Sequence, residues 1–464
     1  MILRLACGLA VIAGAGVAAY VVGVEDGRRD ELRRAESIAR LFYTRPQEGE
    51  DALRKAVRLS ADPHRLLEEF RPALRELAAA GADRNAYSLL AIMWDAGLHD
   101  AEIVELEEAL YRRTQLGQGR SHFPGIKISL DPVILGDRLI LFHKRSMVSE
   151  LDLKAGVVSQ SVDLHVPIHS EALLVDGRVI FASVSGALSC RNADLSEAWT
   201  AKVASRFYDP PLLCSDGARV YALWKEGAGS RLRAVALADG AAAWGPIDLD
   251  DGDPRFAAVS EGWVAAGARR LHAVQAESGA VAAAIGCKTP LAPGVVISGT
   301  RAVAADASEA FAVHLSTGAK EWGRPLPAPP ALAPVALRGR VVFALANGEV
   351  ICLSLMDGRP LWTTRVHENL RMPMVASRDR VYIVDGERHL HQIMIEDGST
   401  ADLGLDFMAG SALAPLLSGG RLIMFDDNLD SNMTKIHLIN TGDRKAGGWT
   451  QKGGGPGRTN LGAD

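Results

Sequence analysis

Few of the motifs that carry catalysis occur in this 464-residue sequence. Its five cysteines lie far apart and form no Cys-Cys or Cys-x-x-Cys pair, which excludes a zinc knuckle, a redox dithiol and a haem attachment sequence. A GxSxG nucleophile motif is missing, and the glycine-rich GGGPGRTN lacks the lysine of a P-loop. The formal net charge is -5 and no stripe of lysine and arginine is present, so we expect no nucleic-acid partner.

What the sequence does contain is a repeated hairpin. The stretch ICLSLMDGRPLW alternates apolar residues, turns at Asp-Gly and ends in tryptophan, and an Asp-Gly pair between apolar runs predicts a tight β-turn. It recurs as AVALADGAAAW and AVHLSTGAKEW, while RNADLSEAW has Leu195 in place of the glycine. Four weaker copies keep only the turn. The turn glycines are Gly156, Gly240, Gly279, Gly318, Gly358, Gly398 and Gly442, and the tryptophans are Trp199, Trp244, Trp322 and Trp362.

A second marker recurs with the same period. An arginine precedes an apolar strand in GDRLILF, DGRVIFA, DGARVYA, GTRAVAA, LRGRVVF, SRDRVYI and SGGRLIM, and Trp263 takes this position in EGWVAAG. Successive markers lie 38 to 44 residues apart from Arg138 to Arg421. Two markers that share one period indicate a true structural repeat.

The repeat predicts an all-β fold, an eight-bladed propeller of four-stranded blades. Each unit of about 40 residues contains three or four short strands with an apolar face that one unit cannot bury alone. An α-solenoid would need an apolar period of 3.6 residues, whereas these segments alternate with a period of two. A β-helix would need a much shorter repeat.

These units resemble the PQQ-like, or quinoprotein-type, β-propeller repeat, and PALAPVALRGRVVFALANGEVICLSLMDGRPLW fits that pattern almost throughout. The resemblance implies that the four tryptophans dock blade against blade. It also implies that the C-terminal tail, residues 447–460, closes the ring, because relatives carry a similar segment before their first blade. A flexible glycine-rich terminus is the alternative. The residues of this closure motif are Trp449, Gly453, Gly454, Pro456, Thr459 and Asn460.

The N-terminus predicts a membrane segment. Leu5 to Val24 is an uncharged run of 20 residues, which is long enough to span a bilayer. We expect a retained anchor within residues 1–24, with a signal peptide as the alternative because Val17-Ala18-Ala19 offers a small-residue cleavage site. Five arginines follow the span and favour a cytoplasmic propeller, but relatives of the repeat are usually exported. We therefore expect the propeller on the extracytoplasmic side, in the periplasm.

Residues 25–117 predict a small helical stalk or domain. Asp62 and Pro63 fit a helix start, an apolar stripe follows, and Gly81 fits a helix end. Asp83 and Asp100 suit the starts of two further helices. The polar residues 115–124 are expected to link this segment to a propeller over residues 125–464.

The sequence contains few patterns that indicate catalysis, cofactor binding or metal binding. The resemblance makes a PQQ-dependent dehydrogenase the first enzymatic hypothesis, but the adjacent cysteines found in many such enzymes are absent, so we expect no cofactor and no catalysis. His389 and His391 would share one strand face, yet two ligands do not make a metal site. The acidic segments DLDDGDP and DDNLDSN are interpreted as surface loops rather than ion sites.

The expected function is therefore a non-catalytic, membrane-anchored scaffold that binds a protein partner in an envelope complex. The nearest analogue is the propeller lipoprotein of the outer-membrane β-barrel assembly machinery. A PQQ-dependent dehydrogenase or a small-ligand sensor is the alternative. Candidate contact loops are residues 225–231, 248–254 and 426–432, whose acids include Asp250, Asp251, Asp253, Asp426, Asp427 and Asp430.

Overall fold

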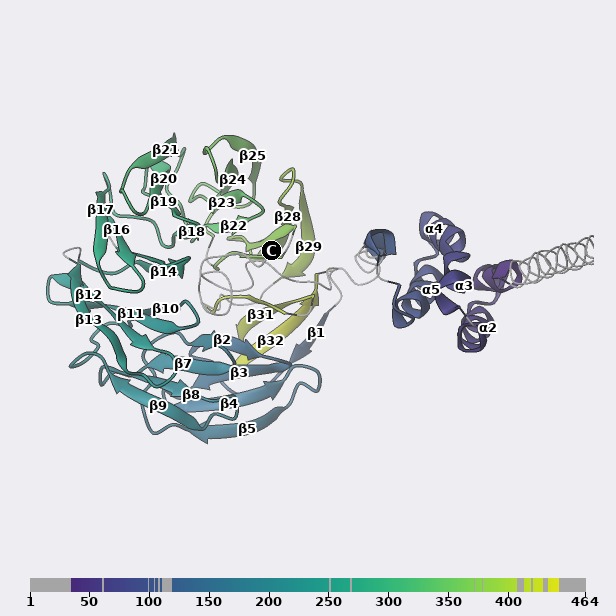
Figure 1. Cartoon of the computed structure of the whole chain (residues 1–464), viewed down its shortest axis with the longest axis horizontal. Helices are drawn as coiled ribbons and strands as arrows, with labels where there is room; N and C mark the ends of the chain where they lie inside the picture. The colour runs from purple at the N-terminus through teal and green to yellow at the C-terminus, as the bar shows by residue number, and fades with distance from the viewer. Residues whose placement is uncertain are drawn as a thin grey trace, which may run out of the picture. The chain divides into compact units, whose positions relative to one another are not determined.

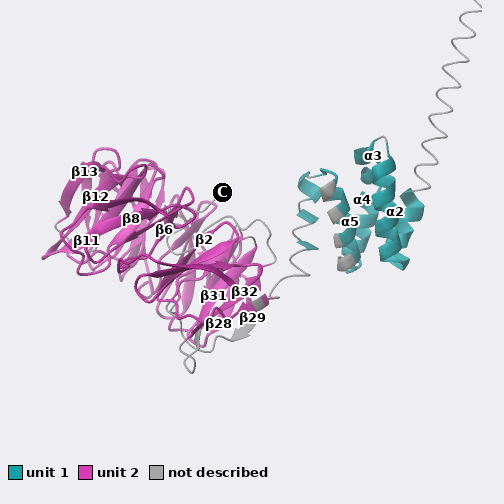
Figure 2. Ribbon diagram, turned by 90° about the horizontal axis from the view of Figure 1, so that it is seen from below, with its two compact units in different colours: residues 1–116, 442–444 teal, residues 117–441, 445–464 magenta. Residues whose placement is uncertain are grey.

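The computed structural model divides into two compact units after Leu116 (Figures 1 and 2). It describes residues 35–60, 62–98, 100–103, 105–106, 109–110, 119–249, 252–267, 269–370, 372–377, 379–406, 413–418, 420–428 and 433–441. The expected membrane segment, Gly442 and the closure motif lie outside these residues. Within the described part of the chain, no helix has the length and apolarity that a bilayer crossing requires.

The first unit consists of short helices around their own core. Residues 35–44 are helical, and α5 packs against both α2 and α4. The named helices are α2 (Pro46–Leu59), α3 (Pro63–Glu68), α4 (Arg71–Ala79) and α5 (Asp83–Asp95). Residues 101–103, 105–106 and 109–110 are also helical. Their apolar faces bury one cluster that includes Phe42, Leu53, Phe70, Leu89 and Leu110.

The helix starts follow the sequence signals. The side chain of Asp62 accepts a hydrogen bond of 3.1 Å from the amide of Arg65, and Pro63 occupies the first helical position. Asp100 accepts a similar bond of 3.1 Å from Ile103. Asp83 is itself the first residue of α5, and Gly81 precedes it with φ +72°, a backbone conformation that glycine adopts without strain.

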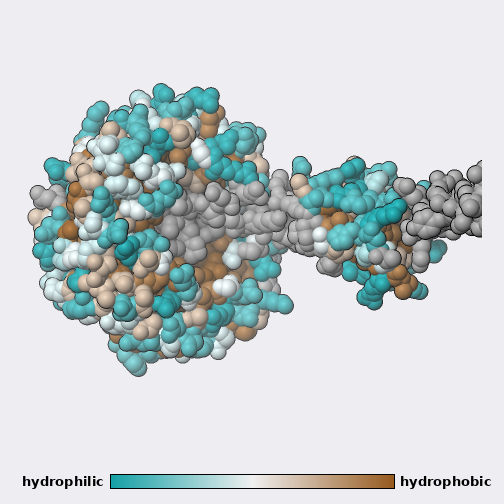
Figure 3. All heavy atoms as spheres, in the orientation of Figure 1, coloured by the Kyte–Doolittle hydropathy of each residue, from teal (hydrophilic) through white to brown (hydrophobic). Residues whose placement is uncertain are grey.

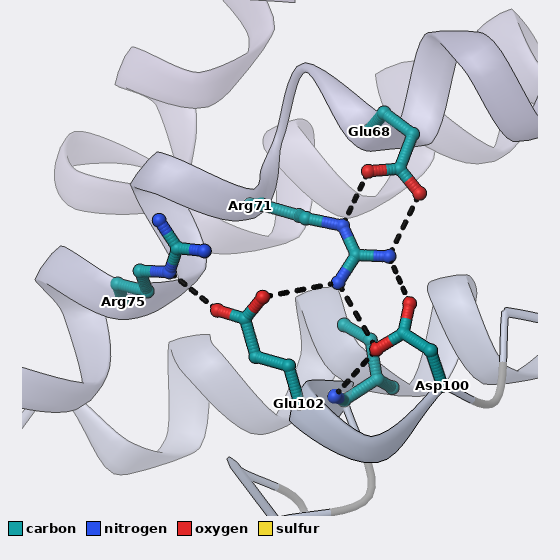
Figure 4. Close-up of polar contacts among 6 residues, drawn as sticks. Glu68, Arg71, Arg75, Asp100 and Glu102 are labelled. Carbon is teal, nitrogen blue, oxygen red and sulfur yellow. Dashed lines mark hydrogen bonds and ion pairs between the residues drawn. The ribbon is translucent and has the colours of Figure 1, made fainter.

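Arg71 ties three segments of this unit together (Figure 4). Its guanidinium contacts Glu68 of α3 and Asp100, and it bonds Glu102 at 3.3 Å, while Arg75 bonds the other oxygen of Glu102 at 2.5 Å. The hydrogen bond from Arg71 is the main reason that the pKa of Asp100 falls to about 2. Only 13% of the Arg71 side chain is exposed, so this cluster is partly shielded from water.

We expect Arg71→Leu to lower the stability of the helical unit by about 1–3 kcal/mol, because it removes charge-assisted hydrogen bonds to three carboxylates. Urea unfolding followed by circular dichroism at 222 nm measures the change. Arg45→Leu is the matched control, since Arg45 is 69% exposed and pairs with the neighbouring Glu48 on the surface. Equal effects of the two substitutions would contradict the role given to Arg71.

The second unit is a ring of eight four-stranded antiparallel sheets, which confirms the predicted propeller (Figure 1). In seven blades the four strands follow one another in the sequence from the innermost to the outermost. The strands of blades 1 to 4 are β2 (Leu130–Leu135), β3 (Arg138–His143), β4 (Met147–Asp152) and β5 (Val158–Asp163); β6 (Leu173–Val175), β7 (Arg178–Ala182), β8 (Ala187–Arg191) and β9 (Glu197–Lys202); β10 (Leu212–Ser215), β11 (Arg219–Glu226), β12 (Gly229–Ala236) and β13 (Ala242–Leu249); and β14 (Phe256–Ser260), β15 (Trp263–Gly267), β16 (Arg270–Gln275) and β17 (Val281–Gly286).

Blades 5 to 7 have the same order, and blade 8 differs in its outermost strand. The strands of blades 5 to 7 are β18 (Val296–Ser298), β19 (Arg301–Ala305), β20 (Glu309–His314) and β21 (Lys320–Pro325); β22 (Val335–Leu337), β23 (Arg340–Ala344), β24 (Glu349–Ser354) and β25 (Pro360–Arg365); and β26 (Val375–Ala376), β27 (Arg380–Val384), β28 (His389–Met394) and β29 (Thr400–Asp406). Blade 8 consists of β30 (Leu416–Ser418), β31 (Arg421–Asn428), β32 (Met433–Asn440) and β1 (Gly119–His122).

The second marker of the sequence coincides with one strand of every blade. All seven marker arginines and Trp263 are the first residues of the second strands, from β3 to β31. The middle strands bury both of their faces, as in the run of four buried residues that ends β23. The core therefore lies between neighbouring blades; for example, Ile180 of blade 2 and Leu213 of blade 3 belong to one cluster.

The ring is closed by a strand from the N-terminal side of the propeller. β1 pairs antiparallel with β32, with Gly119 opposite Ile439 and His122 opposite Ile436. It lies within the segment that the sequence suggests as a linker. Because β1 comes from the start of the ring and β30 to β32 from its end, blade 8 joins the two ends and leaves no unpaired gap.

Candidate functional site

The four repeat tryptophans each bridge two blades. The indole N–H of Trp199 donates to the carbonyl of Leu237 at 2.8 Å, and those of Trp244, Trp322 and Trp362 donate to Ala276, Leu355 and Ile395 at 3.0, 3.2 and 2.8 Å. Each accepting carbonyl lies in the hairpin turn of the next blade. A tryptophan therefore contributes both its apolar area and one hydrogen bond to the contact between blades.

The turn glycine makes room for the tryptophan ring. A Cβ on Gly358 would lie 2.5 Å from Cε3 of Trp322 in the preceding blade. The same holds for Gly240, Gly279 and Gly398, where a Cβ would lie 2.7 to 2.8 Å from a ring carbon of Trp199, Trp244 and Trp362, respectively. The turn of blade 2 has Leu195 instead, at φ +65°. Blade 1 supplies no tryptophan at this place, and the buried Leu195 side chain joins the core of blades 1 and 2. A glycine is thus required where the preceding blade presents a large ring.

At the closure, His122 takes the place of the tryptophan. It lies on β1, and a Cβ on Gly156 of blade 1 would overlap its imidazole ring. Gly156 has φ +74°, like the other turn glycines. The contact of His122 with Gly156 therefore joins blade 8 to blade 1 in the manner of the other junctions.

Several marker arginines also reach the next blade. Arg138 donates to the carbonyl of Ala193 at 3.2 Å, and Arg178 donates to Leu237 at 3.0 Å. The fully buried Arg380 donates to Thr441 at 2.9 Å, and Arg340 bonds Glu396 at 2.9 Å. The arginine at the start of the second strand is thus a second connection between blades, a role that its position in the sequence did not indicate.

Polar side chains connect the strands of blades 7, 8 and 1 at equivalent positions. His391 bonds Asp385 at 2.7 Å in blade 7, and Ser121 bonds Nδ1 of His437 at 3.1 Å in blade 8. In blade 1, Nε2 of His143 lies 2.7 Å from Oγ of Ser149, which lies 2.7 Å from Oγ of Ser161. Ser149 is fully buried and His143 is 4% exposed, so this serine and histidine are not accessible to a substrate.

Burial and neighbouring charges shift the pKa values of several of these groups. It lowers the pKa of His143, with the charge of Lys144 acting in the same direction. It also lowers the pKa of His437, together with Lys435 and against the opposing charge of Asp426. Burial alone would raise the pKa of Asp385, but hydrogen bonds from His391 and from backbone amides more than offset it, so that pKa is lowered.

We expect the propeller to lose stability as the pH falls from 7 to 5. A histidine with a lowered pKa in the folded state takes up its proton more readily when unfolded, so its contribution is lost as the pH falls below its ordinary value of about 6.5. The loss from Asp385 follows only at more acidic pH. Urea unfolding at pH 7, 6 and 5 measures this slope, and the double substitution His143→Gln and His437→Gln is expected to flatten it. An unchanged slope would contradict this assignment.

Two blades carry longer hairpins than the others. β11 and β12 of blade 3 and β31 and β32 of blade 8 have eight residues each, whereas the second and third strands of the other blades have five or six. The second strand of each blade ends, and its third strand begins, on the same rim of the ring as the connections between blades. The described strands of blades 3 and 8 therefore extend farther toward this rim, which we call the connection rim, than those of the other blades.

The structure brings two of the three candidate contact loops together. Lys225 bonds Asp253 at 2.5 Å, and Arg231 bonds Asp248 at 2.6 Å and Glu226 at 3.1 Å. Loops 225–231 and 248–254 thus form one surface at the tip of blade 3. Asp250 and Asp251 lie outside the described residues.

The third loop requires a correction. Asp426 is only 4% exposed and lies 3.8 Å from Nε2 of His437, so it is a buried group and not a surface contact. Asp427 lies in β31, and Asp430 lies outside the described residues. Sequence spacing could not indicate this burial, because it depends on the pairing of β31 with β32.

The two histidines of blade 7 are engaged with different acids. His391 bonds Asp385, while Nδ1 of His389 lies 3.6 Å from Oδ2 of Asp402. Among the described residues, no group of three histidine, cysteine or acidic side chains is arranged to hold a metal ion.

Residues 306–429 match the family model described as "PQQ_2: Outer membrane protein assembly factor BamB". This segment covers blades 6 and 7 and part of blades 5 and 8. The PQQ-like repeat is confirmed. The resemblance that the Gly-Arg strand and Asp-Gly turn indicated is therefore correct for these PQQ-like blades. No curated protein matches the sequence.

Solved structures share the fold of the PQQ-like blades. BamB from Moraxella catarrhalis is 15% identical with a TM-score of 0.52, and the match covers 70% of this chain and 99% of BamB. The computationally designed Ika8 protein is 12% identical with a TM-score of 0.58, covering 70% and 100% of the two chains. Sqt1 from Saccharomyces cerevisiae is 9% identical with a TM-score of 0.53, covering 69% and 98%. At these identities the likeness concerns the fold alone.

Proposed function

We propose that this protein is a non-catalytic scaffold that binds a protein partner in a cell-envelope complex, in the context of outer-membrane protein assembly. Residues 1–24 would attach the chain to a membrane, and the export that is usual for relatives of this repeat would place the propeller on the extracytoplasmic side. The match of residues 306–429 to a family model named for an outer-membrane assembly factor supports this setting. The lack of a recognisable catalytic set in the sequence supports a binding role.

The observation that carries the proposal is the tip of blade 3. Its hairpin projects from the connection rim, two ion pairs join it to the following loop, and a third, between Arg231 and Glu226, lies within the hairpin. Trp224, only 3% exposed, packs edge-on against Phe207 beneath this tip, with ring centroids 5.7 Å apart. A projecting loop held by a buried aromatic pair presents a defined surface to a partner, as binding loops on rigid scaffolds do.

Photocrosslinking in membranes tests the proposal. A benzoylphenylalanine at Ala228, exposed at the tip between β11 and β12, is expected to capture a defined envelope protein. The matched control is the same residue at Ala155, which is exposed in a hairpin turn on the opposite rim. Capture of the same proteins from both positions, or none from Ala228, would contradict the proposal. Saturable binding of PQQ and calcium with dye-linked turnover would instead support a quinoprotein dehydrogenase.

A further inference from the structure

Four exposed cations and one half-buried cation lie on the connection rim around the closure, in blades 8, 1 and 2. Lys144 and Arg145 form the turn between β3 and β4, while Lys202 and Arg206 lie at the end of β9 and just after it. Lys435 lies on β32 of blade 8. Among the described residues, none of these five is paired with a carboxylate, in contrast to Lys225 and Arg231 of blade 3. We call this set the basic rim.

Two aromatic side chains are exposed within the basic rim. Tyr208 is 76% exposed and Phe123 is 68% exposed, which is unusual for large rings in a chain with few aromatic residues. Arg206 lies over the ring of Tyr208 at 5.4 Å, and Lys435 lies over the ring of Phe123 at 5.4 Å. Each ring is therefore covered on one face by a cation.

The loops that carry these side chains are fixed to the blades. Backbone hydrogen bonds join Phe207 to Val184 and Ala204 to Gly186, both at 3.1 Å, so the segment bearing Arg206 and Tyr208 is anchored on both sides. The amide of Ile168 donates to the carbonyl of Arg145 at 2.8 Å. The basic rim is thus a preformed surface, which lowers the entropic cost of binding.

We infer that the basic rim binds an acidic polypeptide segment that carries apolar side chains between its carboxylates. This inference deepens the proposed scaffold function and rests on it. The protein carries a formal net charge of -5, so most of its surface is expected to repel anionic segments. A cluster of cations that are not paired with carboxylates attracts such segments locally. Acids also lie on this arc: Asp163, 3.5 Å from His165, together with Glu171, Asp209 and the buried Asp426, which is opposite Lys435 in the pairing of β31 with β32.

The arrangement of rings and cations favours a polypeptide over other anionic partners. Insertion into a lipid surface requires aromatic side chains that are free to enter the headgroup region, and base stacking by single-stranded nucleic acid requires open ring faces. Here one face of each ring is occupied by a cation. A peptide instead places carboxylates against the cations and apolar side chains against the remaining ring surface.

Fluorescence anisotropy with the full-length chain in detergent micelles tests this inference. The probe is a fluorescein-labelled random copolymer of glutamate and tyrosine, titrated at low and high salt. We expect saturable binding that weakens with salt, and at least tenfold weaker binding for the combined substitution Lys144→Glu, Arg145→Glu and Arg206→Glu. The substitutions Phe123→Ser and Tyr208→Ser are expected to weaken binding of the copolymer more than binding of polyglutamate.

The matched control reverses three exposed cations on the opposite rim, with Lys154→Glu, Arg338→Glu and Arg359→Glu. This variant has the same net charge as the first and is expected to change affinity less than twofold. Equal weakening by the two variants would overturn the inference, because overall charge would then explain binding. It would also be overturned by no binding, by tighter binding to an oligo-dT strand, or by preference for phosphatidylglycerol in mixed micelles.

The two proposals fail in different ways. If the Ala228 crosslinker captures no partner but the copolymer binds the basic rim, the contact assigned to blade 3 is wrong while the basic rim stands. If Ala228 captures a partner and the copolymer does not bind, the inference on the basic rim is wrong and the scaffold function stands. Figure 3 shows hydrophilic residues over much of the periphery of one propeller face. Because the copolymer could bind such residues non-specifically, the opposite-rim variant measures that contribution.

Discussion

Trp322→Ala is expected to lower the free energy of unfolding of the propeller by about 3–5 kcal/mol, the range for removing a buried tryptophan. Trp322 is only 8% exposed, and it belongs to the large core shared by blades 5, 6 and 7. Its loss opens a cavity over Gly358 and leaves the carbonyl of Leu355 without its 3.2 Å hydrogen bond from the indole.

Urea unfolding monitored by circular dichroism in the strand region measures this effect. Met356→Ala is the matched control, because Met356 lies in the same turn as Gly358 and is 65% exposed, so its truncation is expected to cost less than about 0.5 kcal/mol. A Trp322→Ala change of under about 1 kcal/mol would show that the tryptophan does not hold blade 5 to blade 6.

The fold could be predicted because its determinants are local and repeated. A tight turn requires positive φ at one residue, and glycine supplies it at Gly156, Gly240 and the other recurring turns. The arginine before each apolar run marks the first residue of the second strand, as at Arg138 and Arg340. Each signal is readable within about ten residues, and its recurrence gave the number of blades.

The closure could not be predicted from the same signals. β1 has the sequence GRSH, which contains no apolar alternation and no tryptophan. Its position is fixed by pairing with β32, more than 300 residues later in the chain, and by the contact of His122 with Gly156. Long-range pairing of a short polar strand leaves no periodic trace in the sequence.

Neighbouring blades also explain the irregular turn at Leu195. The sequence marks Leu195 as a departure from the repeat, but it does not say why a leucine is tolerated at φ +65°. The reason lies in blade 1, which places no tryptophan against this turn, so the side chain fills the space that a ring occupies elsewhere. Such compensation between units is visible only after the blades have been arranged in a ring.

The candidate site was predictable only in part. The acidic and basic residues of loops 225–231 and 248–254 suggested surface contacts, and the structure places them in one cluster joined by Lys225 and Asp253. Asp426 belongs to a similar acidic stretch but is buried beside His437. The basic rim escapes sequence reasoning because its five cations come from blades 8, 1 and 2 and are never adjacent as a set in the sequence.

Gly156→Ala is the second substitution with a large expected effect, because it tests how the ring is closed. Gly156 has φ +74°, so an alanine there carries a strain of about 1–3 kcal/mol. Its Cβ would also overlap the ring of His122, which must move and take β1 away from its pairing with β32. We therefore expect a loss of stability larger than the backbone strain alone.

Gly177→Ala separates the two contributions. Gly177 has φ +71° and nothing lies within 4 Å of the point that an alanine Cβ would occupy there, so this control carries the strain without the overlap. Urea unfolding of Gly156→Ala, His122→Ala and their combination gives the coupling energy between the two sites. In the His122→Ala background, we expect Gly156→Ala to cost no more stability than the backbone strain alone. The cost of Gly177→Ala should be the same with and without His122. Equal losses of stability for Gly156→Ala and Gly177→Ala would mean that the His122 side chain shifts at no cost. In that case β1 is not fixed through its contact with Gly156.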